Sequence, residues 1–266
     1  MMRVVRAEFQ KLRRARMLLW TAVVVFAVAA LDLLVLPVVT RPDVIARIAA
    51  SGGAFAAGVA AGGYARDWGH LLHFGPQAAA GSWGILTLGL VTAYVFGREY
   101  REGTSQTVLT LPVRREYVVV AKLVVVAAWA LALALLSAAL LVGVVAVLGA
   151  GGFTWSAVLE SFADSVKVAA LLFLTLPVVA WFAMLGRGYL PPMLFSLAMM
   201  MVGNGLVGTS LSRWFPWNLP VHLVGASYMP VPLGGVTLGP VMVSLAVFAA
   251  GVGALMWRID HADSPQ

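Results

Sequence analysis

Long apolar runs separated by short polar intervals organise this sequence. A run of about 20 apolar residues is long enough to cross the hydrocarbon core of a bilayer as a helix. The sequence contains such runs at 17–39, 78–96, 118–148, 168–185, 191–211 and 236–257. Because every backbone polar group inside a bilayer must be satisfied within the protein, these runs should be helical. The pattern therefore predicts an all-α polytopic membrane protein with six transmembrane helices.

The intervals between the runs differ in character. Residues 40–77 form a long segment whose 44–62 part is apolar, but this part contains Arg47 and is rich in Ala and Gly, so we expect a short interfacial or partly re-entrant helix. Residues 153–167 are polar enough to be an outer segment. Residues 212–235 are rich in Pro and aromatic residues, which suits either a re-entrant segment before the last helix or an aromatic interfacial loop.

Prolines should shape two of the spans. Pro177 lies inside the fourth run and is expected to kink it, whereas Pro191 and Pro192 fall in the first turn of the fifth, where proline is tolerated.

Residues 1–16 precede the first run and are strongly basic. Wound as a helix, they place Val5, Phe9 and Leu12 on one face, which predicts an amphipathic interfacial helix on the inner leaflet. This helix could be a topology anchor alone or a lever that touches a cytoplasmic partner. The run that follows is too long for a signal peptide. We therefore divide the chain into this helix, a transmembrane domain at 17–258 and a polar cytoplasmic tail at 259–266.

The distribution of Lys and Arg orients the predicted spans. With both termini inside, the cytoplasmic side receives Arg3, Arg6, Lys11, Arg13, Arg14, Arg16, Arg98, Arg101, Arg114, Arg115, Lys122, Arg187 and Arg258. The outer side receives Arg41, Arg47, Arg66, Lys167 and Arg213. This asymmetry follows the positive-inside rule. A further span at 44–62 would reverse it.

Composition excludes a soluble domain. Apolar residues make up 61% of the chain and charged residues 11%, against roughly 45–50% and 25% in soluble domains. The formal charge of +7 indicates attraction to anionic lipids rather than to nucleic acid. There are no cysteines, and His70 and His73 have no third ligand nearby, so we expect no metal site.

The interval 97–117 is the long charged stretch inside the apolar domain. Gly103 and Pro112 should break the helix on either side of a short 104–111 element. Arg114 and Arg115 should lie at headgroup level, with Lys122 deeper and snorkelling back. The interval lacks an arrangement of residues suited to catalysis. It has the form of a loop that a soluble partner could push.

The same residues carry a resemblance to a known family. The pattern Glu-x-x-x-Gly-Thr from Glu99 to Thr104, then Leu-Pro-x-x-Arg from Leu111 to Arg115 and a downstream Lys122, resembles the ABC-2 permease subunits of ABC exporters. Either Glu99 or Glu102 can fill the acidic position. The N-terminal Glu8 to Lys11 and the aromatic 214–220 stretch are similar to the branch that includes bacitracin and lantibiotic resistance permeases.

The resemblance implies a permease subunit in the bacterial inner membrane, driven by a separate cytoplasmic ABC ATPase that binds ATP and Mg. The chain has no Gly-x-x-x-x-Gly-Lys-Ser/Thr loop, which agrees with this division of labour. A second permease copy or paralogue is implied. The cargo would be hydrophobic or amphiphilic. The residues expected to couple the permease to the ATPase are Glu99, Glu102, Gly103, Thr104, Pro112, Arg114, Arg115 and Lys122.

Candidates for the translocation path are polar residues inside the runs. Asp32 and Asn204 are the two that we single out, whereas Thr87, Thr92, Ser137, Ser196 and Thr209 are expected to serve helix packing. An ion-coupled secondary transporter is the main alternative, but it needs intramembrane ionisable groups, and only Asp32 suits that role. For an intramembrane enzyme the sequence shows neither an acidic pair within the spans nor an evident Ser/His arrangement.

Overall fold

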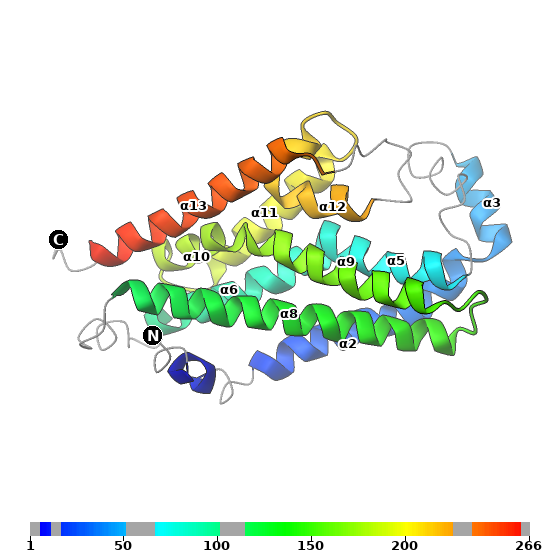
Figure 1. Ribbon diagram of the computed structural model, residues 1–266, viewed down its shortest axis with the longest axis horizontal. Helices are drawn as coiled ribbons and strands as arrows, with labels where there is room; N and C mark the ends of the chain where they lie inside the picture. The colour runs from blue at the N-terminus through cyan, green and yellow to red at the C-terminus, as the bar shows by residue number, and fades with distance from the viewer. Residues whose placement is uncertain (1–5, 12–16, 52–66, 102–114, 226–235, 262–266) are drawn as a thin grey trace.

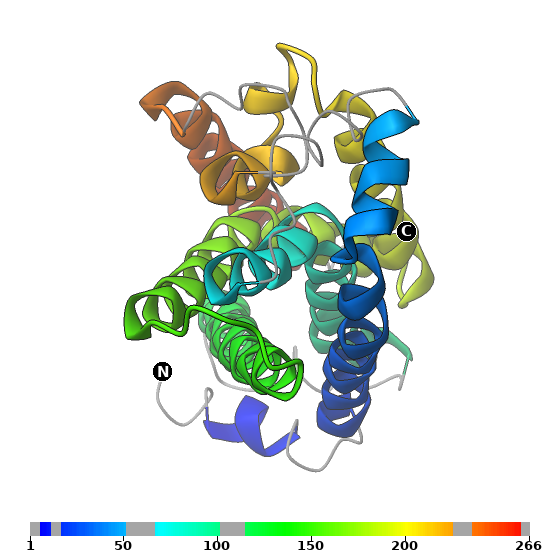
Figure 2. The same ribbon diagram turned by 90° about the vertical axis from the view of Figure 1, so that its right-hand side faces the viewer.

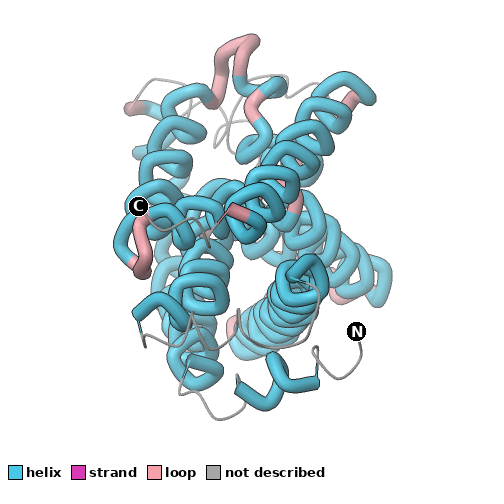
Figure 3. The backbone as a smooth tube through the Cα atoms, turned by 90° about the vertical axis from the view of Figure 1, so that its left-hand side faces the viewer, coloured by secondary structure: helices cyan, strands magenta, loops and turns pink. Residues whose placement is uncertain are grey.

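The computed structural model describes residues 6–11, 17–51, 67–101, 115–225 and 236–261. The chain forms an elongated helical bundle with both termini at one end (Figure 1). It runs back and forth along the bundle through α2, the α5–α6 helix, α8, the α9–α10 pair, α11 and α13. Among the described residues there is no strand, only an isolated bridge between Asp67 and Gly151 (Figure 3).

The first span and the helix after it follow the apolar pattern. Helix α2 covers Met17–Val39, the same residues as the expected first span. Helix α3 covers Pro42–Ala50, and residues 52–62 of the segment in which we expect an interfacial or re-entrant helix lie outside the described residues. Its Asp43 carboxylate accepts from the Arg47 side chain at 2.7 Å.

The helix that contains the second span begins earlier than expected. Helix α5 starts at Trp68 and runs to Ala78, a five-residue π-helical segment η1 covers Ala79–Trp83, and α6 continues over Gly84–Arg101. The helix thus begins before Ala78, the expected start of the span, because Asp67 caps it and accepts from the His70 amide at 3.0 Å; where this helix enters the bilayer stays a prediction. Pro76 lies inside the helix and lacks an N–H, which suits the irregular turn that follows.

The third and fourth passes form an antiparallel pair. Helix α8 covers Arg115–Val147, and α9 starts at Trp155 and ends at Phe173. Residues 155–167 of the expected outer segment form the first part of α9, which Thr154 caps; their position outside the bilayer stays a prediction. Helix α10, Leu176–Leu185, is bent by 43° from α9, in agreement with the kink expected at Pro177.

The last passes enclose a broken segment. Helix α11 covers Leu190–Leu206 and has Pro191 and Pro192 in its first turn, as expected. Short turns follow at Ser212–Trp214 (η2) and Pro216–Asn218 (η3), and α12 covers Leu219–Val224. Helix α13 then covers Leu238–Asp260. The irregularity expected for 212–235 is therefore present over its described part.

These helices confirm a polytopic helical membrane protein. Of the described helices, four are long and apolar enough to span a bilayer, and the bent α9–α10 pair makes up to five. Helix α11 has 17 residues, which rise about 26 Å, against roughly 30 Å of hydrocarbon. The count of six spans and the cytoplasmic placement of both termini stay predictions.

Helix α6 occupies the centre of the packing. Its Leu88, Val91 and Val95 belong to a large buried apolar cluster that also contains Val126 of α8 and Val179 of α10. In the end-on view of Figure 2, α2 (dark blue) and α8 (green) lie beside each other along the bundle, and the two helices are in contact. The charged end of α6 is consequently held among neighbouring helices rather than projecting freely.

Candidate functional site

A buried lysine anchors a network of charges at the end of the bundle that holds the termini. The Lys122 side chain, in the first part of α8, is only 5% exposed, and its Nζ lies 3.1 Å from Glu99 Oε1. It also donates to the Val95 carbonyl at 2.8 Å and lies 4.0 Å from Glu8 Oε2. The expected snorkelling of Lys122 was wrong, because a nearby carboxylate and carbonyl satisfy its ammonium inside the protein.

A second lysine completes the network from the N-terminal segment. Lys11 Nζ donates to Glu8 Oε1 at 2.6 Å and to Glu99 Oε1 at 3.1 Å. Partial burial acts to lower the pKa of Lys11, but the hydrogen bond and charge of Glu8, together with the charge of Glu99, outweigh it and raise the pKa above 10.5. Two carboxylates and two ammonium groups therefore join residues 6–11, α6 and α8. We call Glu8, Lys11, Glu99 and Lys122 the ion network.

The ion network sets how the N-terminal helix faces the bundle. Residues 6–11 are helical. Glu8 is 7% exposed, whereas Phe9, expected on the membrane-facing side, is 44% exposed. Val5 and Leu12 of the predicted apolar face lie outside the described residues. The helix is thus fastened to α6 and α8 by charged groups, with Phe9 directed away from them.

Aromatic rings and arginines flank the ion network. Arg98 donates to the Lys11 carbonyl at 3.3 Å and lies over the Tyr94 ring at 5.7 Å. Tyr94 stacks on Tyr189, and Arg101 lies over that second ring at 5.2 Å. These contacts connect the end of α6 to the turn between α10 and α11.

Most of the predicted coupling interval lies outside the described residues. This applies to Glu102, Gly103, Thr104, Pro112 and Arg114. Arg115 is the first residue of α8. The structure does place residues 97–101 and 115–117 of the interval, and two of the predicted coupling residues, Glu99 and Lys122, pair directly.

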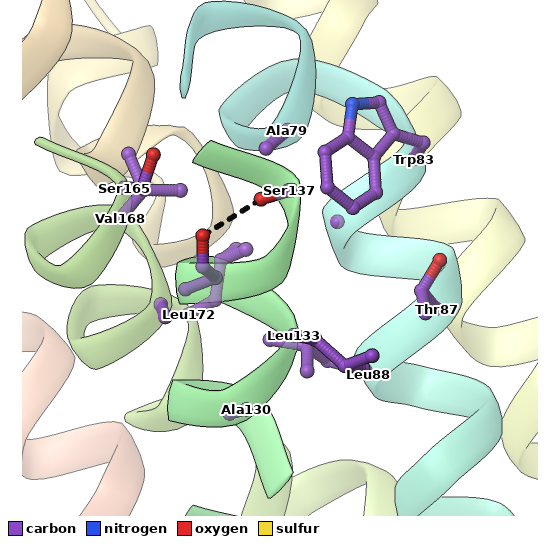
Figure 4. A pocket seen from close by; sticks show the side chains of 13 residues that line it. Ala79, Trp83, Thr87, Leu88, Ala130, Leu133, Ser137, Ser165, Val168 and Leu172 are labelled. Carbon is purple, nitrogen blue, oxygen red and sulfur yellow. Dashed lines mark hydrogen bonds between the residues drawn. The ribbon is translucent and has the colours of Figure 1, made fainter. Parts of the chain in front are cut away.

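Asp32 faces a small internal cavity. It lines a space of about 20 Å³ together with Trp83, Ser137 and Ser165. A neighbouring cavity of about 30 Å³ shares these last three residues, and Figure 4 shows them gathered from η1, α8 and α9. Each cavity has room for about one water molecule. A cargo needs about 300–1,000 Å³, so these two cavities are not its path.

Asn204 connects α11 to the π-helical segment. Its Nδ2 donates to the Gly81 carbonyl at 3.1 Å and to the Met200 carbonyl at 3.0 Å. Irregular turns leave carbonyls without a regular helical partner, and Asn204 supplies one. The sequence did not reveal this role, because nothing in it marks the π turn at Ala79–Trp83.

A buried polar cluster in the broken segment was not foreseen. Ser212 Oγ lies 3.0 Å from His222 Nε2 and accepts from Asn218 Nδ2 at 3.0 Å. Asn218 also donates to the Gly203 carbonyl of α11 at 2.8 Å. The sequence analysis found no Ser/His arrangement, and the structure contains this one. The Ser212 residue is 1% exposed, so the cluster fastens the broken segment to α11 rather than presenting a nucleophile to a substrate.

Four of the remaining polar residues of the spans bond to the backbone of their own segment. Thr92 donates to Leu88 O, Ser137 to Ala134 O, Ser196 to Pro192 O and Thr209 to Leu206 O, all within or beside their own helices. Within the part of the chain that the structure describes, no group of three His, Cys, Asp or Glu residues could hold a metal ion.

Comparison with known proteins decides the family. The family of ABC-2 transporter proteins matches residues 74–203, from the end of α5 to the end of α11. The bacitracin transport permease protein BCRB of Bacillus licheniformis is 30% identical over 149 residues, which cover 55% of this chain and 71% of that protein. The chain belongs to the ABC-2 family of transporter permeases. This confirms the resemblance, including its bacitracin-resistance type.

The family match covers part of the ion network. The matched region contains Glu99 and Lys122 together with the interval between them, whereas Glu8, Lys11 and Asp32 precede it and Asn204 follows it. No solved structure matches this chain. The geometry of the ion network is therefore described from the structure of this ABC-2 permease alone, without a solved relative for comparison.

Proposed function

We propose that this ABC-2 permease is the membrane subunit of an ATP-driven exporter in the bacterial inner membrane. A separate cytoplasmic ABC ATPase would bind ATP and Mg and act on the interval 97–117. The observation that carries this proposal is the pairing of Lys122 with Glu99 at 3.1 Å. It fixes both helices that flank the interval, so a displacement of the interval would reach α6, α8 and the N-terminal helix together.

The proposed cargo is a hydrophobic or amphiphilic molecule of the peptide-antibiotic class. The likeness to a bacitracin transport permease supports this class. A pathway formed with a second permease, identical or paralogous, is also part of the proposal. It is supported by the family match, since ABC-2 permeases typically act with a second permease.

An ion-coupled secondary transporter is the second candidate function. It needs an ionisable group that can exchange ions within the membrane, and Asp32 beside its cavity has a suitable placement. The ion network argues against it, because its charges are already paired and lie next to the interval rather than along a path.

Reconstitution separates these candidates. The permease should be co-expressed with an ABC ATPase encoded beside its gene and placed in vesicles with fluorescent bacitracin. We expect transport that requires the ATPase and ATP and that survives Asp32→Asn. Transport by the permease alone, driven by an ion gradient and abolished by Asp32→Asn, would establish the secondary transporter instead.

A further inference from the structure

A groove opens on the side of the N-terminal helix that faces away from the ion network. It lies between residues 6–11, α2 and α8 and has a volume of about 510 Å³. This lies within the range of roughly 300–1,000 Å³ that is typical of ligand sites. Figures 1 and 2 show the short helix beside the neighbouring ends of α2 and α8.

The N-terminal helix divides its side chains between the two sites. Arg6, Phe9 and Gln10 line the groove, while Glu8 and Lys11 belong to the ion network. Positions i, i+3 and i+4 share one helix face. The ion pairs therefore hold the helix in the rotation that presents Arg6 and Phe9 to the groove.

Helix α8 forms the floor of the groove over the depth of one leaflet. The lining positions run from Val125 to Leu136 and include Ala128 and Ala132. The rise along the helix from Val125 to Leu136 is about 16 Å, close to half of the roughly 30 Å hydrocarbon core. Both alanines are exposed, and their small side chains leave the space that the groove occupies.

The wall of the groove is apolar except at its end. Trp129 donates its ring N–H to Thr21 Oγ1 at 3.3 Å, which satisfies the polar atoms of the wall. Arg6, at the end near the N-terminus, has no ion pair among the described residues, in contrast to Lys11. A single cationic end above an apolar trough is complementary to a negatively charged headgroup with an acyl chain.

We propose that this groove binds one anionic phospholipid, whose phosphate contacts Arg6 and whose acyl chain lies along Ala128 and Ala132. The lipid fills the space between the N-terminal helix and the bundle and so braces that helix from the side opposite the ion network. The site concerns lipid binding alone and does not depend on ATP-driven transport. Its occupant is a bilayer lipid, not the cargo and not a second copy of the chain.

Native mass spectrometry of the full chain tests the site. The protein is purified from membranes, delipidated and titrated with phosphatidylglycerol or phosphatidylcholine. We expect tight retention of one phosphatidylglycerol per chain and weaker retention of phosphatidylcholine. Arg6→Gln should weaken phosphatidylglycerol binding roughly fivefold, since one charge near a lipid surface contributes about that factor.

Filling the groove should abolish the site without removing a charge. Ala128→Phe and Ala132→Phe should lose the retained lipid, whereas Ala139→Phe, at another exposed alanine of α8 that does not line the groove, should keep it. Equal retention by Ala128→Phe, or equal loss in Ala139→Phe, would show a general lipid annulus and overturn the proposal.

Two further outcomes would also overturn it. The chain has no cysteine, so Ala128→Cys provides a single thiol in the groove. Disulfide-linked dimers of this variant in membranes would show that a second copy covers the groove. Displacement of phosphatidylglycerol by micromolar bacitracin would show that the groove is a cargo site.

Discussion

Lys122→Met is the perturbation that most directly tests the energetics of the ion network. It replaces the ammonium with an apolar side chain of similar length and leaves Glu99, which is 14% exposed, with Lys11 still beside it. The Lys11 side chain is 42% exposed. A solvated partner of this kind compensates a buried carboxylate less well than Lys122, which is 5% exposed.

The expected cost follows from the distance and the surroundings. Two unit charges 3.1 Å apart attract by about 5 kcal/mol at an effective dielectric constant near 20. Desolvation of both ions cancels much of this attraction, yet removing one member of a buried pair typically costs about 3–5 kcal/mol. Because Lys11 remains beside Glu99, we expect the lower end, about 3 kcal/mol of unfolding free energy.

Reversible unfolding in mixed detergent micelles measures this quantity. Lys167→Met is the matched control, because Lys167 pairs with Asp164 at 2.9 Å but is 55% exposed. Such a surface pair should contribute about 0–1 kcal/mol. The double variant Lys122→Met/Glu99→Gln should recover part of the loss, since it removes the uncompensated carboxylate. If Lys122→Met costs no more than Lys167→Met, the reasoning is wrong.

Three further predictions concern other contacts. Asn204→Leu should lower the unfolding free energy by about 1 kcal/mol in the same assay, because it removes the hydrogen bonds to Gly81 and Met200. An unchanged unfolding free energy would show that these hydrogen bonds do not stabilise the contact between α11 and η1. Gly97→Val should cost about 1–3 kcal/mol, because its Cβ would lie 2.9 Å from the Gly188 carbonyl, whereas Gly253→Val meets nothing within 4 Å and should be tolerated. Raising the pH should release the N-terminal helix, because the folded state raises the pKa of Lys11 above 10.5. The charged Lys11 side chain therefore stabilises the folded state fully below pH 10.5, and this stabilisation is lost as the pH passes through the raised pKa. A spin label at Ala7→Cys should become mobile in this range, and Lys11→Arg, which stays charged, should prevent it.

The apolar pattern was sufficient for the main architecture. Residues 17–39 proved to be one helix, α2, and the bend near Pro177 follows from the missing N–H of proline. Helix starts were harder to predict where the first turns of a long helix carry polar residues and only the following turns are apolar. This is why the segments beginning at Trp68 and Trp155 looked like loops.

The candidate site could be predicted only in part. The charged interval was evident from the scarcity of charge elsewhere, and Glu99 stood out within it and Lys122 just after it. The partners Glu8 and Lys11 are far from them in the chain, and the pairing of distant charges depends on how the helices pack. The Ser212–His222–Asn218 cluster lies within a short stretch of chain, but its contacts depend on the irregular turns η2 and η3, whose conformation the sequence pattern does not specify.

The central claim is that the ion network transmits the action of the ATPase on the 97–117 interval to the membrane helices. The direct measurement compares ATP hydrolysis and bacitracin transport in vesicles that contain the wild-type or the Lys122→Met permease with its ATPase. We predict that the variant complex still assembles and hydrolyses ATP while transport per ATP falls at least tenfold, with Lys167→Met unaffected. Unchanged transport per ATP in a correctly assembled Lys122→Met complex would contradict the claim.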